Sequence, residues 1–322
     1  MKNFMKTSLA VALSAMAVIT VSCSKDEDES YVDSYSPTLT EAKGTAYTAN
    51  DYFPLVKNNS YMYSANLVIT GTETTNGTKE TINEKDTSYS YAYVKGKEKV
   101  TFESGTKEVI TYYNNGDEVY YQINDNGIVC VGQKSNGSII EFKNNTVFLK
   151  KSLEVGDSWP YNPTDDYSEL FSSWGVSASD MKYTAKIFVV GKESFKLNDT
   201  SVTALRMDQV IEFSVNMSES ENGVSYKITM SMKMTAPNYY AKGVGLVKQK
   251  VDATIKMEMS ASGNGRSASA SVEANIKGTN ELSYFSKGLT SKKSSVEPGS
   301  NVFSVIQGMK AQLLEKCKKN IK

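Results

Sequence analysis

Runs of alternating apolar and polar residues dominate this chain from residue 51 onward. Residues 226–234, 251–259 and 268–276 each place an apolar side chain at every second position. Between residues 205 and 217 the apolar side chains again share one face, interrupted by Gln209. A period of two predicts β-strands that have one buried and one solvated face.

Short segments rich in Asn, Asp and Gly separate these runs. Such residues tolerate positive φ and favour tight hairpin turns; they occur at 114–117, 124–127, 135–137, 221–223 and 262–265. Strands with one apolar face predict an antiparallel sheet, because strands buried on both faces would be continuously apolar. The sheet must bury its inner face by packing on a second sheet or by curling. We expect an all-β fold with a large antiparallel curled sheet or half-barrel.

Two segments depart from the strand pattern. Residues 162–182 are typical of a loop with a short helix, in which Asp166 and Glu169 have the spacing of a capping box. After residue 300 the apolar residues follow a helical spacing, at Val302, Ile306, Met309, Leu313 and Cys317. We expect a C-terminal amphipathic helix that covers one opening or face of the sheet.

The N-terminus has the pattern of a secretory signal. Lys2 and Lys6 precede an apolar run over residues 9–21, which is shorter than the roughly 20 residues that span a bilayer. Cys23 follows the small residue Ser22, as in bacterial lipoprotein signals, which predicts acylation of Cys23. The alternative is an ordinary signal peptide with a chance cysteine, because Thr20 stands where Leu, Val or Ile is usual.

A charged patch follows the cysteine and consists of Lys25, Asp26, Glu27, Asp28 and Glu29. It resembles the export signal of surface-exposed Bacteroidota lipoproteins, and the alternative is a merely solvated tether. We expect an outer-membrane, lipid-anchored protein at the cell surface. The expected organisation is a signal peptide (1–22), an acidic flexible tether (23–50), an antiparallel β domain (51–290) and a C-terminal linker and helix (291–322).

Composition excludes several classes of chemistry. The chain contains no histidine, which removes His-based acid–base catalysis, catalytic triads and imidazole metal sites. Loss of residues 1–22 removes two lysines and no acid, so the net charge changes from zero to minus two. Nucleic-acid binding is therefore not expected, and neither is a metal or cofactor. Cys130 and Cys317 either pair or remain as buried apolar residues.

Six methionines on the alternating strands are the best candidates for a ligand-lining surface. Pliable thioethers in a concavity suit an acyl chain or another irregular apolar ligand, although they can equally be core fillers. Phe171 and Trp174, in the irregular loop, are candidates for gating or stacking, with ordinary packing as the alternative. The six methionines are Met217, Met230, Met232, Met234, Met257 and Met259.

Acidic residues near the irregular loop offer a weaker alternative. Asp157, Asp165, Asp166 and Glu169 could supply an acid–base pair for glycoside hydrolysis. Their spacing is unspecific, and helix capping together with solvation explains them. We therefore expect no enzyme activity.

Four segments, 52–55, 59–63, 155–159 and 239–248, follow a YFPL…VGDSW…YYAKGVGLVK pattern. This pattern resembles that of an uncharacterised family of Bacteroidota outer-membrane lipoproteins. This chain departs from the family at Lys57-Asn58, where a glycine is usual, and at Tyr61, where Trp is usual. The resemblance implies a mostly antiparallel β domain akin to the half-barrels of periplasmic lipoprotein carriers, and it implies no activity or site residues.

Two functions follow from these observations. The first is a non-catalytic binding module for an apolar or lipid-like ligand in a sheet concavity. The second is a surface protein that binds glycans or partner proteins through exposed aromatics, suggested by twenty tyrosines and paired aromatics. The pairs are Tyr112-Tyr113, Tyr120-Tyr121 and Tyr239-Tyr240.

Overall fold

The computed structural model describes residues 30–114, 116–135, 137–161, 177–221, 223–263, 266–287 and 302–321. Cys23 and the charged patch at 25–29 lie outside these ranges. Phe171 and Trp174 also lie outside them, as does the predicted loop and helix up to residue 176.

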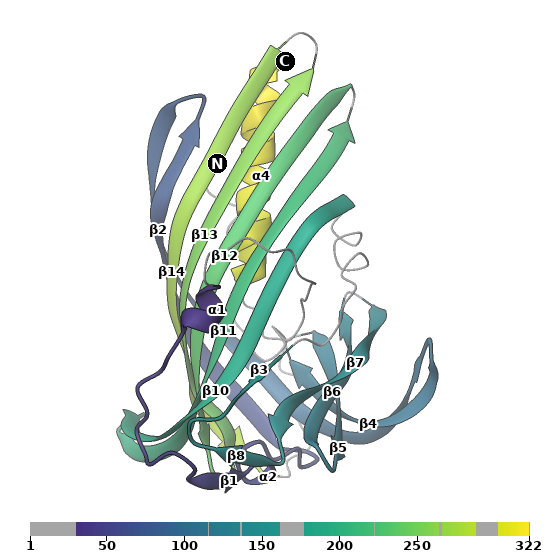
Figure 1. Ribbon diagram of the computed structural model, residues 1–322, viewed down its shortest axis with the longest axis vertical. Helices are drawn as coiled ribbons and strands as arrows, with labels where there is room; N and C mark the ends of the chain where they lie inside the picture. The colour runs from purple at the N-terminus through teal and green to yellow at the C-terminus, as the bar shows by residue number, and fades with distance from the viewer. Residues whose placement is uncertain are drawn as a thin grey trace.

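In the described part of the chain, twelve strands form one antiparallel sheet, which curls without closing (Figure 1). The predicted all-β curled sheet is therefore confirmed. From edge to edge the strands are β7 (Ser138–Lys150), β6 (Gly127–Ser135), β5 (Asp117–Asn124), β4 (Gly105–Asn114), β3 (Thr78–Phe102), β2 (Ser60–Thr75), β14 (Arg266–Ser286), β13 (Gly245–Gly263), β12 (Val224–Ala241), β11 (Thr200–Glu221), β10 (Ser177–Leu197) and β9 (Ser158–Pro160).

Tight turns connect most neighbouring strands. The β2–β3 turn places Asn76 at φ 47° and Gly77 at φ 85°, and the β10–β11 turn uses Asn198 and Asp199, also at positive φ. Each of the five turn segments predicted from the sequence joins two consecutive strands. Positive φ matches the right-handed twist of the flanking strands, which explains why Asn, Asp and Gly occupy these positions.

Strands β2 and β14 form a seam in the middle of the sheet. They pair antiparallel from Ala270↔Thr75 to Ser286↔Ser60. The Ser283 hydroxyl donates a hydrogen bond to the Met62 carbonyl at 2.9 Å, across 221 residues of sequence. Within the described sheet, this is the pair of neighbours that is not consecutive along the chain.

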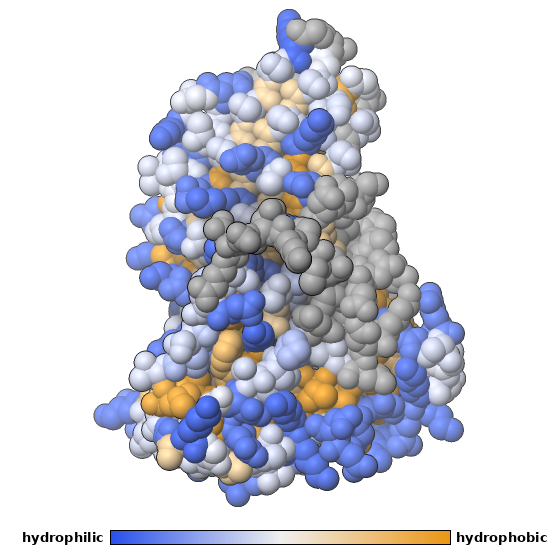
Figure 2. All heavy atoms as spheres, in the orientation of Figure 1, coloured by the Kyte–Doolittle hydropathy of each residue, from blue (hydrophilic) through white to orange (hydrophobic). Residues whose placement is uncertain are grey.

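Among the described residues, two large hydrophobic clusters lie on the concave face of the sheet. The first contains the six predicted methionines and is called the methionine cluster. It lies on β2 and β10–β14. The second includes Phe53, Tyr61, Tyr63 and Trp159 and is called the aromatic cluster. It lies at the other end of the sheet, beside α2 (Ala49–Tyr52) and the short pair of strands β1 (Ala46–Thr48) and β8 (Ser152–Glu154). On the face shown in Figure 2, hydrophilic residues cover most of the long strands, and hydrophobic residues gather mainly near the lower end.

Strands β3 to β7 curl further and enclose a third, smaller cluster built on Val100, Phe102 and Val131. Glu141 on β7 stabilises this curled segment through contacts with residues near the β3–β4 turn. It accepts hydrogen bonds from the Ser104 backbone N–H at 3.0 Å and from Lys107 Nζ at 2.7 Å, both near the β3–β4 turn.

Residues 30–50 pack against the sheet, although the sequence predicts a flexible tether over 23–50. The short helix α1 (Tyr31–Ser34) lies on the outer face, where Val32 is fully buried. The Thr40 N–H donates to the Val190 carbonyl at 3.1 Å, and the Tyr35 hydroxyl donates to Asp208 at 2.6 Å. Apolar and hydrogen-bonding side chains without a periodic pattern therefore suffice to hold this segment in place.

The C-terminal helix α4 (Val302–Ile321) lies on the opposite, concave face (Figure 1). It contacts β13 and β14, and its residues Met309, Leu313 and Cys317 are buried in the methionine cluster. The prediction of a helix that covers one face of the sheet is confirmed for these residues. Cys130 and Cys317 are both free and buried, in different clusters, so they do not pair.

Candidate functional site

The six predicted methionines share the concave face of β11, β12 and β13. Each of them is at most 4% exposed. Met230 lies directly opposite Met257, Met232 is opposite Phe213, and Met259 is opposite Ile228. The strand register therefore brings the methionines together as one continuous apolar surface, here called the methionine face.

Helix α4 covers part of this face and is fastened by an ion pair. Lys316 Nζ lies 2.6 Å from Glu73 and 3.1 Å from Glu80, which belong to β2 and β3. Burial opposes the charge of Lys316, but the two carboxylates outweigh it and raise the pKa of the ammonium group. Glu73 is itself buried, so the ion pair also neutralises a carboxylate at the rim of the cluster. The methionine face thus serves as core in this conformation.

A row of three amide side chains crosses the concave face between the two hydrophobic clusters. Asn238, Gln249 and Asn280 lie on β12, β13 and β14, and each is directly opposite the next. We call these three residues the amide row. Their side chains are 7%, 0% and 6% exposed. Gln249 Nε2 donates to Asn238 Oδ1 at 2.5 Å, and Asn238 Nδ2 donates to the Ala236 carbonyl at 2.9 Å.

Several polar atoms on and beside the amide row have no hydrogen-bond partner among the residues that the structure describes. They include Gln249 Oε1 and Asn280 Oδ1, together with the hydroxyls of Ser88 and Ser90 on β3. The register continues from Asn280 through Ala65 to Ser88, so these atoms belong to the same band of the concave face. Buried acceptors and hydroxyls are normally partnered in native proteins, and this band therefore has unused hydrogen-bonding capacity.

Sequence reasoning missed the amide row, although its signal was present. The alternation that places Met230 to Met234 inward continues to Asn238, and the alternation around Val251 and Ile276 includes Gln249 and Asn280. A polar residue at an inward position was noted only at Gln209, which is buried on the neighbouring strand β11. Extending each strand by its period of two past its apolar residues finds the whole row.

The outer face carries a group of tyrosines that differs from the predicted pairs. Both members are buried in the pairs Tyr120-Tyr121 and Tyr239-Tyr240, so these two pairs lack the expected solvent-facing ring, whereas Tyr113 of the first pair is partly exposed. Tyr89 and Tyr284 are instead 54% and 52% exposed. Tyr93 and Tyr113 lie opposite each other with ring centroids 4.8 Å apart, and Tyr91 lies beside Tyr93 at 5.7 Å. The tyrosine ridge consists of Tyr89, Tyr91, Tyr93, Tyr113 and Tyr284.

Of the four acidic residues that could supply an acid–base pair, the structure describes Asp157. Asp157 makes an ion pair with Lys150 at 2.7 Å, whereas Asp165, Asp166 and Glu169 lie outside the described residues. Among the residues that the structure describes, no group of three or more Cys, Asp or Glu side chains is placed to hold a metal ion. Within the same residues, no helix has the length and apolar character needed to cross a membrane.

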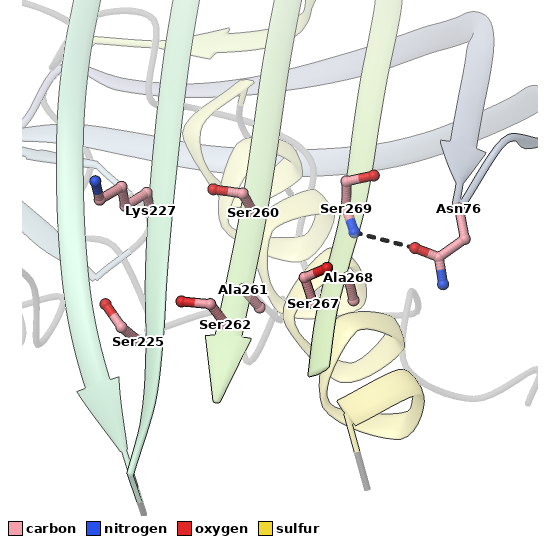
Figure 3. A pocket seen from close by; sticks show the side chains of 9 residues that line it. All are labelled: Asn76, Ser225, Lys227, Ser260, Ala261, Ser262, Ser267, Ala268 and Ser269. Carbon is pink, nitrogen blue, oxygen red and sulfur yellow. Dashed lines mark hydrogen bonds between the residues drawn. The ribbon is translucent and has the colours of Figure 1, made fainter. Parts of the chain in front are cut away.

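A serine-rich hollow of about 450 Å³ lies where the β11–β12, β13–β14 and β2–β3 hairpins end (Figure 3). Its rim carries one charged side chain, Lys227, and the Ser269 N–H donates to Asn76 Oδ1 at 3.0 Å. Its remaining lining consists of Ser225, Ser260, Ala261, Ser262, Ser267 and Ala268. Small hydroxyl side chains on an open surface hold no fixed geometry for a ligand.

Comparison with protein-family models finds no matching family, and comparison with curated proteins finds no match. Solved structures similar to this chain include Ail, the attachment invasion locus protein of Yersinia pestis, in complex with the heparin analogue sucrose octasulfate. The two are 9% identical over 70% of this chain and 99% of Ail, with a TM-score of 0.13.

Two further solved structures are similar at the same level. Pseudomonas aeruginosa OccK11 (OpdR) is 8% identical, with 72% of this chain and 100% of that chain covered and a TM-score of 0.17. A triple mutant of Rhodopseudomonas blastica porin is 9% identical, with 69% and 99% covered and a TM-score of 0.14. TM-scores of this size support no inference about fold, location or function.

Proposed function

We propose that this chain is an outer-membrane lipoprotein, anchored through acylated Cys23 and exposed at the cell surface by the charged patch at 25–29. We further propose that its sheet binds an amphipathic, lipid-like ligand and catalyses no reaction. The anchor rests on the sequence of residues 1–29. The ligand class rests on the chemistry of the concave face.

The observation that carries this proposal is the methionine face with helix α4 lying across part of it. Six thioethers adapt to the irregular shape of an acyl chain more readily than branched side chains do. Helix α4 covers the face with a narrow stripe, in which Met309, Leu313 and Cys317 are buried and Gln312 and Glu315 are exposed. An acyl chain could take the place of this apolar stripe on the methionine face, because both are apolar. Helix α4 then occupies the ligand surface when no ligand is bound.

The direct test is native mass spectrometry of the full chain purified from its host envelope. The expected result is a bound amphiphile that is lost when Met232 is changed to Gln. The matched control is Lys233→Gln, because Lys233 is the exposed neighbour on the outer face of the same strand. A wild-type chain that carries no amphiphile and takes up none when amphiphiles are added contradicts the proposal.

The anchor has a separate test. Growth with an alkyne-tagged fatty acid is expected to label the wild-type chain and not the Cys23→Ala variant. Protease added to intact cells is expected to degrade the wild-type chain, and replacement of Lys25 and the four acids by Ala is expected to protect it. Equal labelling of Cys23→Ala excludes the lipid anchor.

A second candidate function, glycan binding, is favoured by the tyrosine ridge. Its rings lie on the solvent side of β3, β4 and β14, where flat aromatic faces can stack on sugar rings. Binding to a glycan array that disappears on Tyr89→Ser and Tyr284→Ser supports this function. Equal array signals from the wild type and both variants would contradict glycan binding by the tyrosine ridge.

A further inference from the structure

The amide row lies at a chemical boundary on the concave face. On β13, Val251 belongs to the methionine cluster and Val247 to the aromatic cluster, and Gln249 lies between them. On β14, Ile276 and Leu282 divide in the same way on either side of Asn280. A polar band between two apolar surfaces has the arrangement that an amphipathic molecule needs.

Burial of the amide row leaves specific atoms without partners. Gln249 Oε1 and Asn280 Oδ1 are acceptors, and the Ser90 hydroxyl belongs to a residue that is 0% exposed. Each buried polar group left without a partner costs roughly 1–3 kcal/mol, which apolar residues at the same positions would avoid. Asn238 is hydrogen-bonded within the fold, but folding alone provides no partner for Gln249 Oε1 or Asn280 Oδ1, whereas a bound molecule that donates hydrogen bonds does.

The neighbours of the amide row define the charge of that molecule. On the concave face, Gln249 is surrounded by Val247, Val251, Asn238 and Asn280, and the next residues across the sheet are Met207 and Ala65. All of these side chains are uncharged. An anionic group would face carbonyl oxygens without a cation to neutralise it, and an ammonium group would lack a carboxylate. Hydroxyl groups fit both restrictions because they donate hydrogen bonds without charge.

We propose that the amide row binds the uncharged, hydroxyl-bearing headgroup of an amphiphile whose acyl chain lies on the methionine face. This inference rests on the proposed function and adds the class of headgroup. Hydroxyls of the headgroup donate to Gln249 Oε1 and Asn280 Oδ1, and the adjoining strands β11–β13 receive the chain.

The test compares two probes of equal chain length, monomyristoylglycerol and myristate, by titration of the full chain. The wild type is expected to bind the glycerol ester about tenfold more tightly, since two neutral hydrogen bonds together contribute about 1–2 kcal/mol. In Gln249→Leu/Asn280→Leu this preference is expected to vanish while myristate still binds. The matched control is Asn275→Leu, an exposed amide on the outer face of β14, which keeps the preference.

The outcomes separate this inference from the proposed function. If the double variant still prefers monomyristoylglycerol to myristate, the headgroup site is wrong, although the proposed binding of an apolar chain still stands. Failure of the wild type to bind either probe overturns the proposed function itself. Crystals grown with the glycerol ester that show only bridging waters at the amide row also overturn the headgroup site. Should the double variant not fold, Asn280→Ala alone is expected to lower the preference by about threefold, because one hydrogen bond is lost.

Discussion

Glu141 links the two ends of the curled segment β3–β7, so its ionisation contributes to stability. Burial opposes the negative charge, but hydrogen bonds from Lys107 and Ser104 outweigh that effect and lower the pKa of Glu141 to about 2. A lowered pKa means that the folded state favours the ionised form more than the unfolded state does. This contribution is present above the ordinary pKa of 4.5 and is lost as the pH falls towards 2.

We therefore expect Glu141→Gln to flatten the decrease in stability between pH 4.5 and pH 2. At pH 7 the variant is expected to be less stable than the wild type, and near pH 2 the two are expected to converge. Thermal melting over this pH range measures the difference. The control is Glu108→Gln, which removes an exposed ion pair with Lys97. A parallel offset at every pH would contradict the assignment to Glu141.

Arg206 is one of two arginines in the chain and holds the N-terminal segment on the outer face. Its guanidinium donates to both carboxylate oxygens of Asp208, at 2.7 and 2.8 Å, and to Glu193 at 2.8 Å. Asp208 is fully buried and also accepts the hydroxyl hydrogen bond of Tyr35. Burial and this carboxylate raise the pKa of Tyr35. Lysine cannot reproduce the two-pronged contact.

Arg206→Ala is expected to destabilise the protein by about 3–5 kcal/mol, because it leaves a buried carboxylate unpaired. Tyr35→Phe is expected to cost only about 1 kcal/mol, since one hydrogen bond is lost. Both variants are also expected to release residues 30–45 to proteolysis before the sheet unfolds. Urea unfolding and timed digestion measure the two effects, and equal destabilisation by both changes would contradict the ranking.

At the scale of elements, α4 and the proposed ligand compete for one surface. Leu313 is fully buried on the methionine cluster, and Leu→Ala in such positions costs about 2–5 kcal/mol. If about 1.4–2.8 kcal/mol of that loss weakens the docking of α4, the apparent affinity for monomyristoylglycerol rises about 10- to 100-fold in Leu313→Ala.

Titration of the full chain measures this change, with circular dichroism to confirm that the sheet is intact. The control is Gln312→Ala, because Gln312 is the exposed neighbour of Leu313 on the same helix. An affinity that is unchanged or lower in Leu313→Ala would show that α4 does not occupy the ligand surface.

The elements themselves were largely predictable from the sequence. Apolar alternation and Asn-Gly turns predicted the hairpins, and the spacing of Met309, Leu313 and Cys317 predicted the face of α4. The bulges were not predictable, because they depend on how two strands pair. Register shifts occur between Tyr239 and Tyr240 and between Leu282 and Tyr284. Each shift changes which face the following residues occupy, so alternation along the sequence does not place both Tyr239 and Tyr240.

At the scale of the whole molecule, the seam between β2 and β14 joins the two halves of the sheet. Gly71 lies in this seam opposite Ala274, and a Cβ atom there would stand 2.2 Å from the Glu273 carbonyl oxygen. Gly71→Val is expected to destabilise the whole sheet by about 1–3 kcal/mol, because the backbones must move apart. Urea unfolding measures this cost. The control, Thr72→Val, changes the exposed neighbour, and equal losses in both variants would contradict a role of close backbone approach.

Strand order and the seam lay beyond sequence reasoning. Hairpins are local and are encoded by turns, whereas the pairing of β2 with β14 depends on contacts between residues that are far apart along the chain. For the candidate site too, local patterns were predictable and long-range proximity was not. The methionines were found because they belong to one alternating pattern, and the amide row was missed because its members come from three strands whose register fixes their proximity.

The seam also determines when the protein can finish folding. Strand β2 lacks one of its two neighbours until residues 266–286 are available, so the sheet cannot be completed while the chain is still emerging. Pairing across 221 residues is slow to form, because loop closure must precede any gain from contacts. For an exported lipoprotein, which we propose this chain to be, the fold can be completed only after residues 266–286 have emerged. The last long strand of the sheet therefore sets the point in the chain at which the fold can be completed.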